Sequence, residues 1–547
     1  MHTPSRRTLL RAPTAVAAAG LLASCTGTGT RSRSGARGGG TGEGGFVPPG
    51  PRGYVDPSGP QVRAAERRRG SGPVRMIRFT AAETTVDLGG RSVRTWTYHE
   101  TLPGPLVRVT AGDVLSLTLA NRLPATTTLH SHGVRLRCDM DGAPGLTQNA
   151  VPPGSDFTYR FTVPHPGTYL LHSHVGLQPD RGLYAPLIVD DPKEPLSYDK
   201  EWIIVLDDWL DGVQGSTPDQ VLTQLLPDAG ASTAAASAGS MAMGPGPGRP
   251  APGGNASPHA SPPHRPTGPS RVLHRSYSRA LGGDAGNVAY PHYLANGRLP
   301  GNPSVFRCRP GERIRLRIIN AGSDTAFRVA LGGHAMTVTH TDGYPVAHKD
   351  TDALLLGMAE RYDVLVTAGD GVFPFVALAE GKKGQALAVL RTDRGRTPPP
   401  AGVRPGELDG RTVPAHRLAP DDSVALDHRE PDRELRLRIT GTMRKYDWGF
   451  DHQPYSANRR HPVREGERVR LTLINATDMW HPMHLHGHTF ALTGIDAAGA
   501  RKDTAAVLPH RKLVVDFDAD NPGLWMLHCH NQYHSETGMM TVLGYRA

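Results

Sequence analysis

The stretch GERVRLTLIN, residues 466–475, decides the fold of this 547-residue chain. It begins with a turn glycine and an acid, continues with alternating apolar residues and ends in asparagine. The same pattern occurs as GDVLSLTLAN at 112–121 and as GERIRLRIIN at 311–320. Alternation with a period of two, rich in Val, Ile and Thr, predicts a strand with one buried face. Three copies therefore predict three related β-domains.

The spacing of these copies predicts the domain boundaries. A chain of this length is too long for a single core. Its apolar residues show almost no helical periodicity, and glycine (64 residues) and proline (49 residues) are abundant. We predict an all-β protein of three Greek-key sandwich domains at 73–195, 200–395 and 425–547. Residues 228–272, rich in Ala, Gly, Ser and Pro, are predicted to be a disordered insertion in the second domain. Residues 396–424 are predicted to be an interdomain linker.

The positive charge of the chain lies almost entirely at its N-terminus. Residues 1–72 hold 11 arginines and 3 acidic residues, a net of +8 out of the total of +10. The high net charge therefore gives no argument for nucleic-acid binding. Residues 26–72, rich in Gly, Arg, Pro and Ser, are predicted to be a flexible tether.

The first 25 residues resemble an export signal. Arg6 and Arg7 precede a short, weakly apolar run, as in twin-arginine signals. The run ends in LASC, which resembles a lipoprotein cleavage box and predicts a lipid on Cys25; plain cleavage nearby is the alternative. We expect an extracellular or cell-envelope protein whose membrane contact is this lipid anchor alone. In an oxidising compartment Cys138 and Cys308 either form a disulfide or stay as buried thiols, and the sequence leaves both open.

Eight of the 26 histidines fall in four His-x-His pairs. Residues i and i+2 of a strand point the same way, so each pair presents two imidazoles to one point. The spacing from the closing asparagine to the pair is nine residues in both the first and the third domain, and the middle domain has no such pair. We predict a metal site at the interface of domains one and three, formed by His130, His132, His172, His174, His484, His486, His528 and His530.

Cys529 lies between two of these histidines, in the stretch LWMLHCHNQYH at 524–534. Strand alternation turns its sulfur away from the face that carries His528 and His530. The sulfur is therefore predicted to serve a second metal. A site of two histidines and a cysteine with a weak axial methionine is typical of electron-transfer copper. The available partners are His481, His534 and Met539.

Four motifs together resemble the three-domain multicopper oxidases, the family of laccases, bilirubin oxidases and bacterial cuprous oxidases. They are HSHG at 130–133, HSH at 172–174, HPMHLHGH at 481–488 and HCHNQYHSETGM at 528–539. The resemblance covers nearly all of 73–547 and implies three cupredoxin-like domains and four copper ions. It implies type 1 copper ligands His481, Cys529, His534 and Met539. It implies type 2 ligands His130 and His484, and type 3 ligands His132, His172, His174, His486, His528 and His530.

The resemblance also implies a reaction. One-electron donors would be oxidised at the type 1 site, electrons would pass through Cys529 to His528 and His530, and O2 would be reduced to water. Phenols or aromatic amines are the expected donors, with Cu(I) or Fe(II) as the alternative and a non-catalytic envelope scaffold as a remote one. Asp141 matches an acid that relatives use as a proton relay, although Asp-Gly is also a good turn dipeptide. Where some relatives carry another relay acid this chain has Ser535. We expect a monomer.

Overall fold

The computed structural model describes residues 51–227, 268–392 and 403–547. Within these ranges the strands form six sheets, two for each of the three predicted domains. The three-domain, all-β prediction is confirmed.

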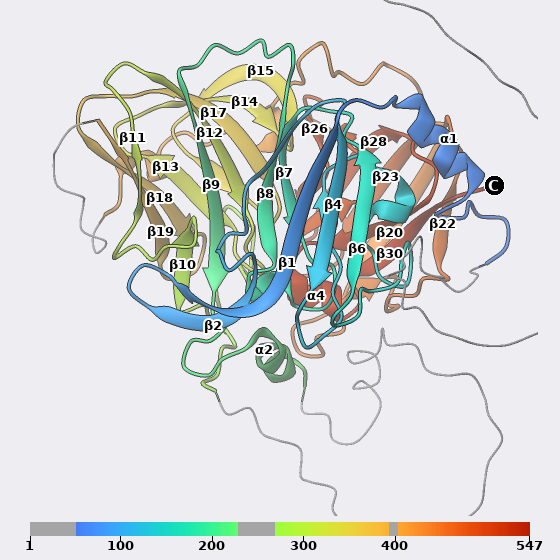
Figure 1. Cartoon of the computed structure of the whole chain (residues 1–547), viewed down its shortest axis with the longest axis horizontal. Coiled ribbons are helices and arrows are strands. Elements are labelled where there is room, and N and C mark those ends of the chain that lie inside the picture. Colours follow the sequence, from blue (N-terminus) through green and yellow to red (C-terminus); the bar gives the residue numbers. More distant parts are fainter. Residues whose placement is uncertain (1–50, 228–267, 393–402) are drawn as a thin grey trace, which may run out of the picture. The chain divides into compact units, whose positions relative to one another are not determined.

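The first domain packs two four-stranded sheets. One has the order β2 (Ser92–Tyr98), β1 (Val74–Asp87), β4 (Val114–Asn121), β6 (Asp156–Thr162). Figure 1 shows β1, β4 and β6 of this sheet side by side. The other has the order β3 (Val107–Thr110), β8 (Tyr184–Asp190), β7 (Gly167–His172), β5 (His130–His132).

The middle domain has larger sheets. The first runs β10 (His292–Ala295), β9 (Lys200–Trp209), β12 (Arg313–Asn320), β17 (Arg361–Thr367), β14 (Met336–Thr341), β15 (Tyr344–Thr351). The second runs β11 (Ser304–Arg307), β19 (Gln385–Arg391), β18 (Val372–Ala379), β13 (Phe327–Leu331), β16 (Leu354–Leu356).

The third domain repeats this plan. Its first sheet runs β21 (Gly449–Phe450), β20 (Arg433–Thr440), β23 (Arg468–Asn475), β28 (Lys512–Asp518), β25 (Phe490–Leu492), β26 (Arg501–Lys502). Its second runs β22 (Arg460–Val463), β30 (Met540–Tyr545), β29 (Leu524–Cys529), β24 (His481–Leu485), β27 (Thr504–Val507).

The repeated sequence pattern forms the equivalent strand in each domain, namely β4, β12 and β23. Each pairs in parallel with the domain's opening strand and antiparallel with a later one. The closing asparagine has a structural purpose. The Nδ2 of Asn475 donates to the carbonyls of Met479 and Val507, and its Oδ1 accepts from the amide of Thr477. Asn121 and Asn320 form the same kind of corner: the Nδ2 of each donates to a backbone carbonyl, and its Oδ1 accepts from the amide two residues further on. In the third domain this corner fixes the turn that leads into β24.

The helices of the described residues are short. They are α1 (Pro60–Arg68), α2 (Pro218–Leu225) and α4 (Gln532–Glu536), with single 3-10 turns η1 (Cys138–Met140), η2 (Pro179–Arg181), η3 (Gly406–Asp409) and η4 (Ala415–Arg417). None of the helices in the described ranges is long and apolar enough to cross a membrane.

The tether predicted at 26–72 is too long, because residues 51–72 are folded. Val55 and Val62 are buried, and α1 starts at a proline, which suits the first helical turn. Glu66 accepts a hydrogen bond from the Thr162 amide of domain one, and Arg69 donates to Asn521 of domain three. A few apolar residues in an Arg- and Gly-rich segment were enough to dock it. The predicted signal and Cys25 lie outside the described residues.

Two other predicted boundaries also shift. Of the insertion expected at 228–272, residues 268–272 are described and bonded, since the Arg271 amide donates to Gln224; residues 228–267 lie outside the described ranges. The described part of the expected linker, 403–424, packs closely, with Leu408 and Leu418 fully buried. Cys138 and Cys308 are both free and buried, so they do not form a disulfide.

Candidate metal centres

Paired strands bring the eight histidines together. His130 and His172 are register partners between β5 and β7, and His484 and His528 are partners between β24 and β29. Across the two domains, the ring centroids of His130 and His486 lie 3.9 Å apart and those of His132 and His484 lie 3.6 Å apart. Seven of the eight side chains are buried and His174 is partly buried.

The nitrogen atoms of this cluster point to metal ions. A buried polar atom without a partner costs about 1–3 kcal/mol, and folded proteins avoid such atoms. Here many ring nitrogens are buried and have no hydrogen-bond partner among the described residues: Nε2 of His130, His172, His174 and His484, Nδ1 of His132, and both nitrogens of His530. The Nε2 atoms of His486 and His528 face each other at 3.0 Å. Several imidazole nitrogens that lie close together without hydrogen-bond partners are the set of donor atoms that a metal cluster requires.

The opposite ring nitrogens are fixed by the backbone. Nδ1 of His172 lies 2.7 Å from the Ser173 carbonyl oxygen, and Nδ1 of His528 lies 2.8 Å from the carbonyl oxygen of Cys529. Such contacts place the proton on Nδ1 and leave Nε2 free to bind a metal. Burial also lowers the pKa of His528 to about 3, so the ring is neutral, which is the form that binds metal.

The second centre lies on the other side of strand β29. Sγ of Cys529 is 3.8 Å from Nδ1 of His481 and 3.8 Å from Nδ1 of His534, and these two nitrogens are 3.2 Å apart. All three side chains are fully buried. Burial raises the pKa of the Cys529 thiol, so a cation is needed to hold it as thiolate. The arrangement fits copper in a His2Cys site.

Met539 is placed beside this centre by the chain itself. Its amide donates to the His534 carbonyl, and its carbonyl accepts from the Cys529 amide at 3.1 Å. The methionine is fully buried. Because Cys529 is flanked by His528 and His530, consecutive residues of one strand join the two centres.

Asp141 lies against the histidine cluster. Its Oδ2 is 2.8 Å from Nδ1 of His486, and its backbone carbonyl oxygen is 2.7 Å from Nδ1 of His130. Its other carboxylate oxygen is buried, has no hydrogen-bond partner in the part of the chain that the structure describes, and lies 3.3 Å from Nδ1 of His130. Sequence reasoning therefore selected an acid that contacts two of the predicted ligands.

Sequence reasoning missed a second acid, Asp503. Its Oδ1 lies 3.0 Å from Nε2 of His132. His132 therefore differs from the other seven histidines: its Nε2 contacts a carboxylate, and its Nδ1 is the nitrogen without a hydrogen-bond partner among the described residues. Arg361 donates to both carboxylate oxygens, at 2.7 and 2.6 Å. Burial alone would raise the pKa of Asp503, but Arg361 and His132 lower it well below its usual value. The only sequence signal was an acid at the start of an apolar strand.

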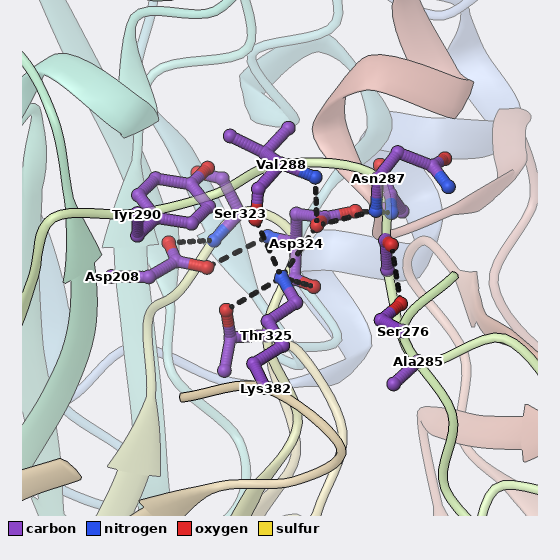
Figure 2. A network of polar contacts seen from close by, with 12 residues as sticks. Asp208, Ser276, Ala285, Asn287, Val288, Tyr290, Ser323, Asp324, Thr325 and Lys382 are labelled. Carbon is purple, nitrogen blue, oxygen red and sulfur yellow. Dashed lines mark hydrogen bonds and ion pairs between the residues drawn. The ribbon is translucent and has the colours of Figure 1, made fainter. Parts of the chain in front are cut away.

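Another residue that sequence reasoning missed reaches the cysteine centre from the middle domain. Oδ1 of Asn287 lies 2.9 Å from Nε2 of His534. Figure 2 shows how the Asn287 segment is held: the amides of Asn287 and Val288 both donate to the Asp324 carboxylate, and Lys382 donates to the same group at 2.6 Å. Asp324 also accepts from Asn531. The middle domain, which has no His-x-His pair, therefore helps to build the centre.

Three β-sandwich domains, a buried His2Cys centre and an adjoining cluster of eight histidines define a copper oxidase that couples one-electron oxidation to reduction of O2. The chain belongs to the multicopper oxidase family, which it matches over residues 80–194, 272–395 and 428–546. Members are copper-dependent oxidoreductases that use O2. The family prediction made from the four motifs is confirmed.

Individual relatives agree with this assignment. The chain is 47% identical over 490 residues to the multicopper oxidase MmcO of Mycobacterium tuberculosis, covering 88% of this chain and 90% of that protein. It is 30% identical to a copper resistance protein A homolog of Pseudomonas syringae pv. tomato, covering 84% and 90%. The crystal structure of Fet3p, a multicopper oxidase that functions in iron import, matches with a TM-score of 0.67 at 22% identity, covering 86% and 90%, and supports the fold alone.

Proposed function

We propose that the enzyme is laccase-like: it oxidises phenolic or aromatic donors one electron at a time at the Cys529 centre and reduces O2 to water at the histidine cluster. One observation carries this proposal. The sulfur of Cys529 faces His481 and His534, whereas the neighbouring His528 and His530 belong to the other cluster. Copper in these sites would supply reversible one-electron chemistry and the binding of O2.

The proposed ligand sets keep the assignment made from the four motifs, and several contacts support it. The type 1 site would be held by His481, Cys529, His534 and Met539. One type 3 ion fits His174, His486 and His528, whose nitrogens lie within 4.8 Å of one another. The other fits His132, His172 and His530, because the His530 ring lies 4.9 Å from that of His132 and 5.2 Å from that of His172. The type 2 ion would be held by His130 and His484.

The remaining residues position and protect this chemistry. Asp141 is proposed to deliver protons, since its carboxylate contacts His486 and lies close to His130. Burial of both centres keeps bulk water away from partly reduced oxygen. His488 is proposed to be structural: its ring bonds Tyr545 and the His486 carbonyl and does not face the cluster.

Oxidation of Cu(I) or Fe(II) is the second candidate. Proteins named copper resistance protein A are 30% and 29% identical to this chain over 84% of its length, which favours a cuprous substrate. The third candidate, a copper-free envelope scaffold, does not explain why so many histidine nitrogens are buried with no hydrogen-bond partner within the described ranges.

Steady-state oxygen uptake separates these candidates. The copper-loaded enzyme is assayed with a phenol, with Cu(I) and with Fe(II), and the Cys529→Ser variant serves as the control that lacks the sulfur ligand. A higher kcat/KM for the phenol supports the proposal. A far higher value for either metal ion would replace it with a metallo-oxidase, and a colourless, inactive protein after copper loading would favour the scaffold.

We also propose export through the twin-arginine pathway, lipid attachment at Cys25 and a monomeric state. The support for export and lipid attachment is the Arg6-Arg7 pair and the LASC sequence. Mass spectrometry of the protein from the membrane fraction tests for a lipid on Cys25. A Cys25→Ala variant should be found in the soluble fraction instead.

A further inference from the structure

Asn531 lies between the two metal centres in the chain. It follows His530 of the histidine cluster and directly precedes α4, which carries His534 of the Cys529 centre. Its Oδ1 accepts hydrogen bonds from the amides of Tyr533 at 3.1 Å and His534 at 3.3 Å, so it caps the helix. Burial raises the pKa of Cys529, and a hydrogen bond from the Asn531 backbone amide to the sulfur opposes that effect. The position of Asn531 therefore affects both the sulfur and His534.

The side chain of Asn531 is anchored by the middle domain. Its Nδ2 donates to Oδ1 of Asp324 at 2.6 Å, across 207 positions of sequence. A second hydrogen bond lies next to the first, since the amide of Gln532 donates to the carbonyl of Ser323 at 3.0 Å. Both Asn531 and Asp324 are buried. Two adjacent residues of the middle domain therefore hold two adjacent residues of domain three.

Asp324 is itself held in place from several directions, as Figure 2 shows. Its second carboxylate oxygen accepts from the amides of Asn287 and Val288, and from Lys382, whose side chain is 1% exposed. Its own amide donates to the Asp208 carboxylate. Hydrogen bonds to a carboxylate are stronger than those between neutral groups, and this one is paired with a buried cation. Asp324 is therefore a fixed acceptor for the Asn531 side chain.

The helix α4 is too short to hold its own position. Helices shorter than about 12 residues are marginal without tertiary contacts, and α4 has five residues. Its segment makes two buried hydrogen bonds of 2.6 Å to carboxylates, from Asn531 to Asp324 and from the Tyr533 hydroxyl to Asp180. The first bond belongs to the residue whose amide contacts the sulfur, and the second does not. The two bonds can therefore be tested against each other.

We propose that Asp324 is a positioning residue of the Cys529 centre. Through the Asn531 side chain it keeps the Asn531 amide on the sulfur, and it thereby raises the reduction potential of the centre. The inference rests on the ligand set given under the proposed function and deepens it.

The direction of the effect follows from charge. Reduction of the centre adds one electron, and the sulfur carries part of the added charge. An N–H dipole that points at the sulfur therefore stabilises the reduced form more than the oxidised form. Hydrogen bonding around the cysteine sulfur is one of the features that tune the potential of such copper sites. If the Asn531 side chain loses its anchor, the amide moves away from the sulfur and the potential falls.

The test compares two variants of the copper-loaded full chain. Asn531→Ser removes the donor to Asp324 but keeps a hydroxyl oxygen that can cap α4. Tyr533→Phe is the matched control, because it removes an equally short bond from the same helix to a buried carboxylate and leaves Asn531 in place. The main readout is the reduction potential of the Cys529 centre, measured by anaerobic redox titration of the blue absorption. Stability to denaturant is measured beside it.

Asn531→Ser should lower the potential. At a fixed ambient potential, the ratio of oxidised to reduced centre should rise about tenfold, which for one electron is about 59 mV. The blue absorption should shift as well. Tyr533→Phe should lose stability but keep the wild-type potential and absorption. If Asn531→Ser does not fold, Asp324→Asn combined with Lys382→Met weakens the same contact without leaving a charge unpaired, and this ratio should rise about threefold.

Two results would overturn the inference. One is an Asn531→Ser enzyme, or the double variant in its place, whose potential equals or exceeds that of the wild type, because Asp324 would then contribute to stability alone. The other is a Tyr533→Phe enzyme whose potential falls as far as that of Asn531→Ser. In either case a wild-type enzyme that is blue and consumes O2 with a phenol leaves the proposed function standing, so the two failures are distinguishable.

Discussion

Replacing Arg361 by methionine should destabilise the protein more than any change to a surface ion pair. Arg361 is fully buried and connects three domains: it donates to both oxygens of Asp503, to the carbonyl of Thr168 and to that of Ala359. Removing one partner of a buried pair leaves the other charge uncompensated, which costs about 3–5 kcal/mol. We expect the free energy of unfolding to fall by that amount.

The assay is denaturant unfolding of the copper-free protein, followed by tryptophan fluorescence, because bound copper would mask part of the loss. Arg94→Met is the matched control. Arg94 pairs with Glu83 on the surface, where loss of the pair should cost less than about 1 kcal/mol. A double-mutant cycle sharpens the test. Arg361→Met combined with Asp503→Asn should cost less than the sum of the single changes, since no charge is left unpaired.

The reasoning fails if Arg361→Met unfolds at the same denaturant concentration as Arg94→Met, or if the double variant is strictly additive. Either outcome would mean that the Arg361–Asp503 pair is not the electrostatic link between the domains that its geometry indicates.

Three further predictions concern single side chains. Cys529→Ser should lose the intense blue absorption and about one copper per chain by metal analysis, yet keep the copper of the histidine cluster; loss of all copper would contradict separate centres. Asp141→Asn should slow O2 uptake by about a hundredfold without changing the blue absorption, and an unchanged rate would exclude the relay role. Burial raises the pKa of Asp211 to about 6 despite Arg181 and Thr95. The folded state then holds a proton that the unfolded state has released, so stability should fall by up to about 3 kcal/mol as pH rises from about 4 to 6. Asp211→Asn should flatten this part of the unfolding profile, and a wild-type slope in that variant would refute the assignment.

The sequence predicted the parts of the site that follow from strand periodicity. Histidines at i and i+2 share a face, so the four pairs and the opposite orientation of Cys529 could be read directly. The repeated pattern ending in Asn121, Asn320 and Asn475 placed the three domains, because each asparagine closes the same kind of corner.

The supporting residues could not be predicted in the same way. Asn287 lies 247 positions before His534, and Arg361 lies 142 positions before Asp503. They meet only through tertiary packing, and no local periodicity marks them. Both belong to the middle domain, which lacks His-x-His pairs and therefore gave no sign of contributing to the centres.

The folded segment at 51–72 shows the same limit. Its composition is that of a tether, yet Val55 and Val62 dock it against the domains. Composition averages over a window, whereas docking depends on a few apolar positions that meet a matching surface.

The most direct test of the account is a crystal structure of the copper-loaded enzyme with anomalous scattering recorded at the copper absorption edge. The account predicts one copper peak bounded by His481, Cys529 and His534, and three more among the eight paired histidines. A structure in which copper avoids Cys529, or in which the paired histidines hold no cluster, would contradict it.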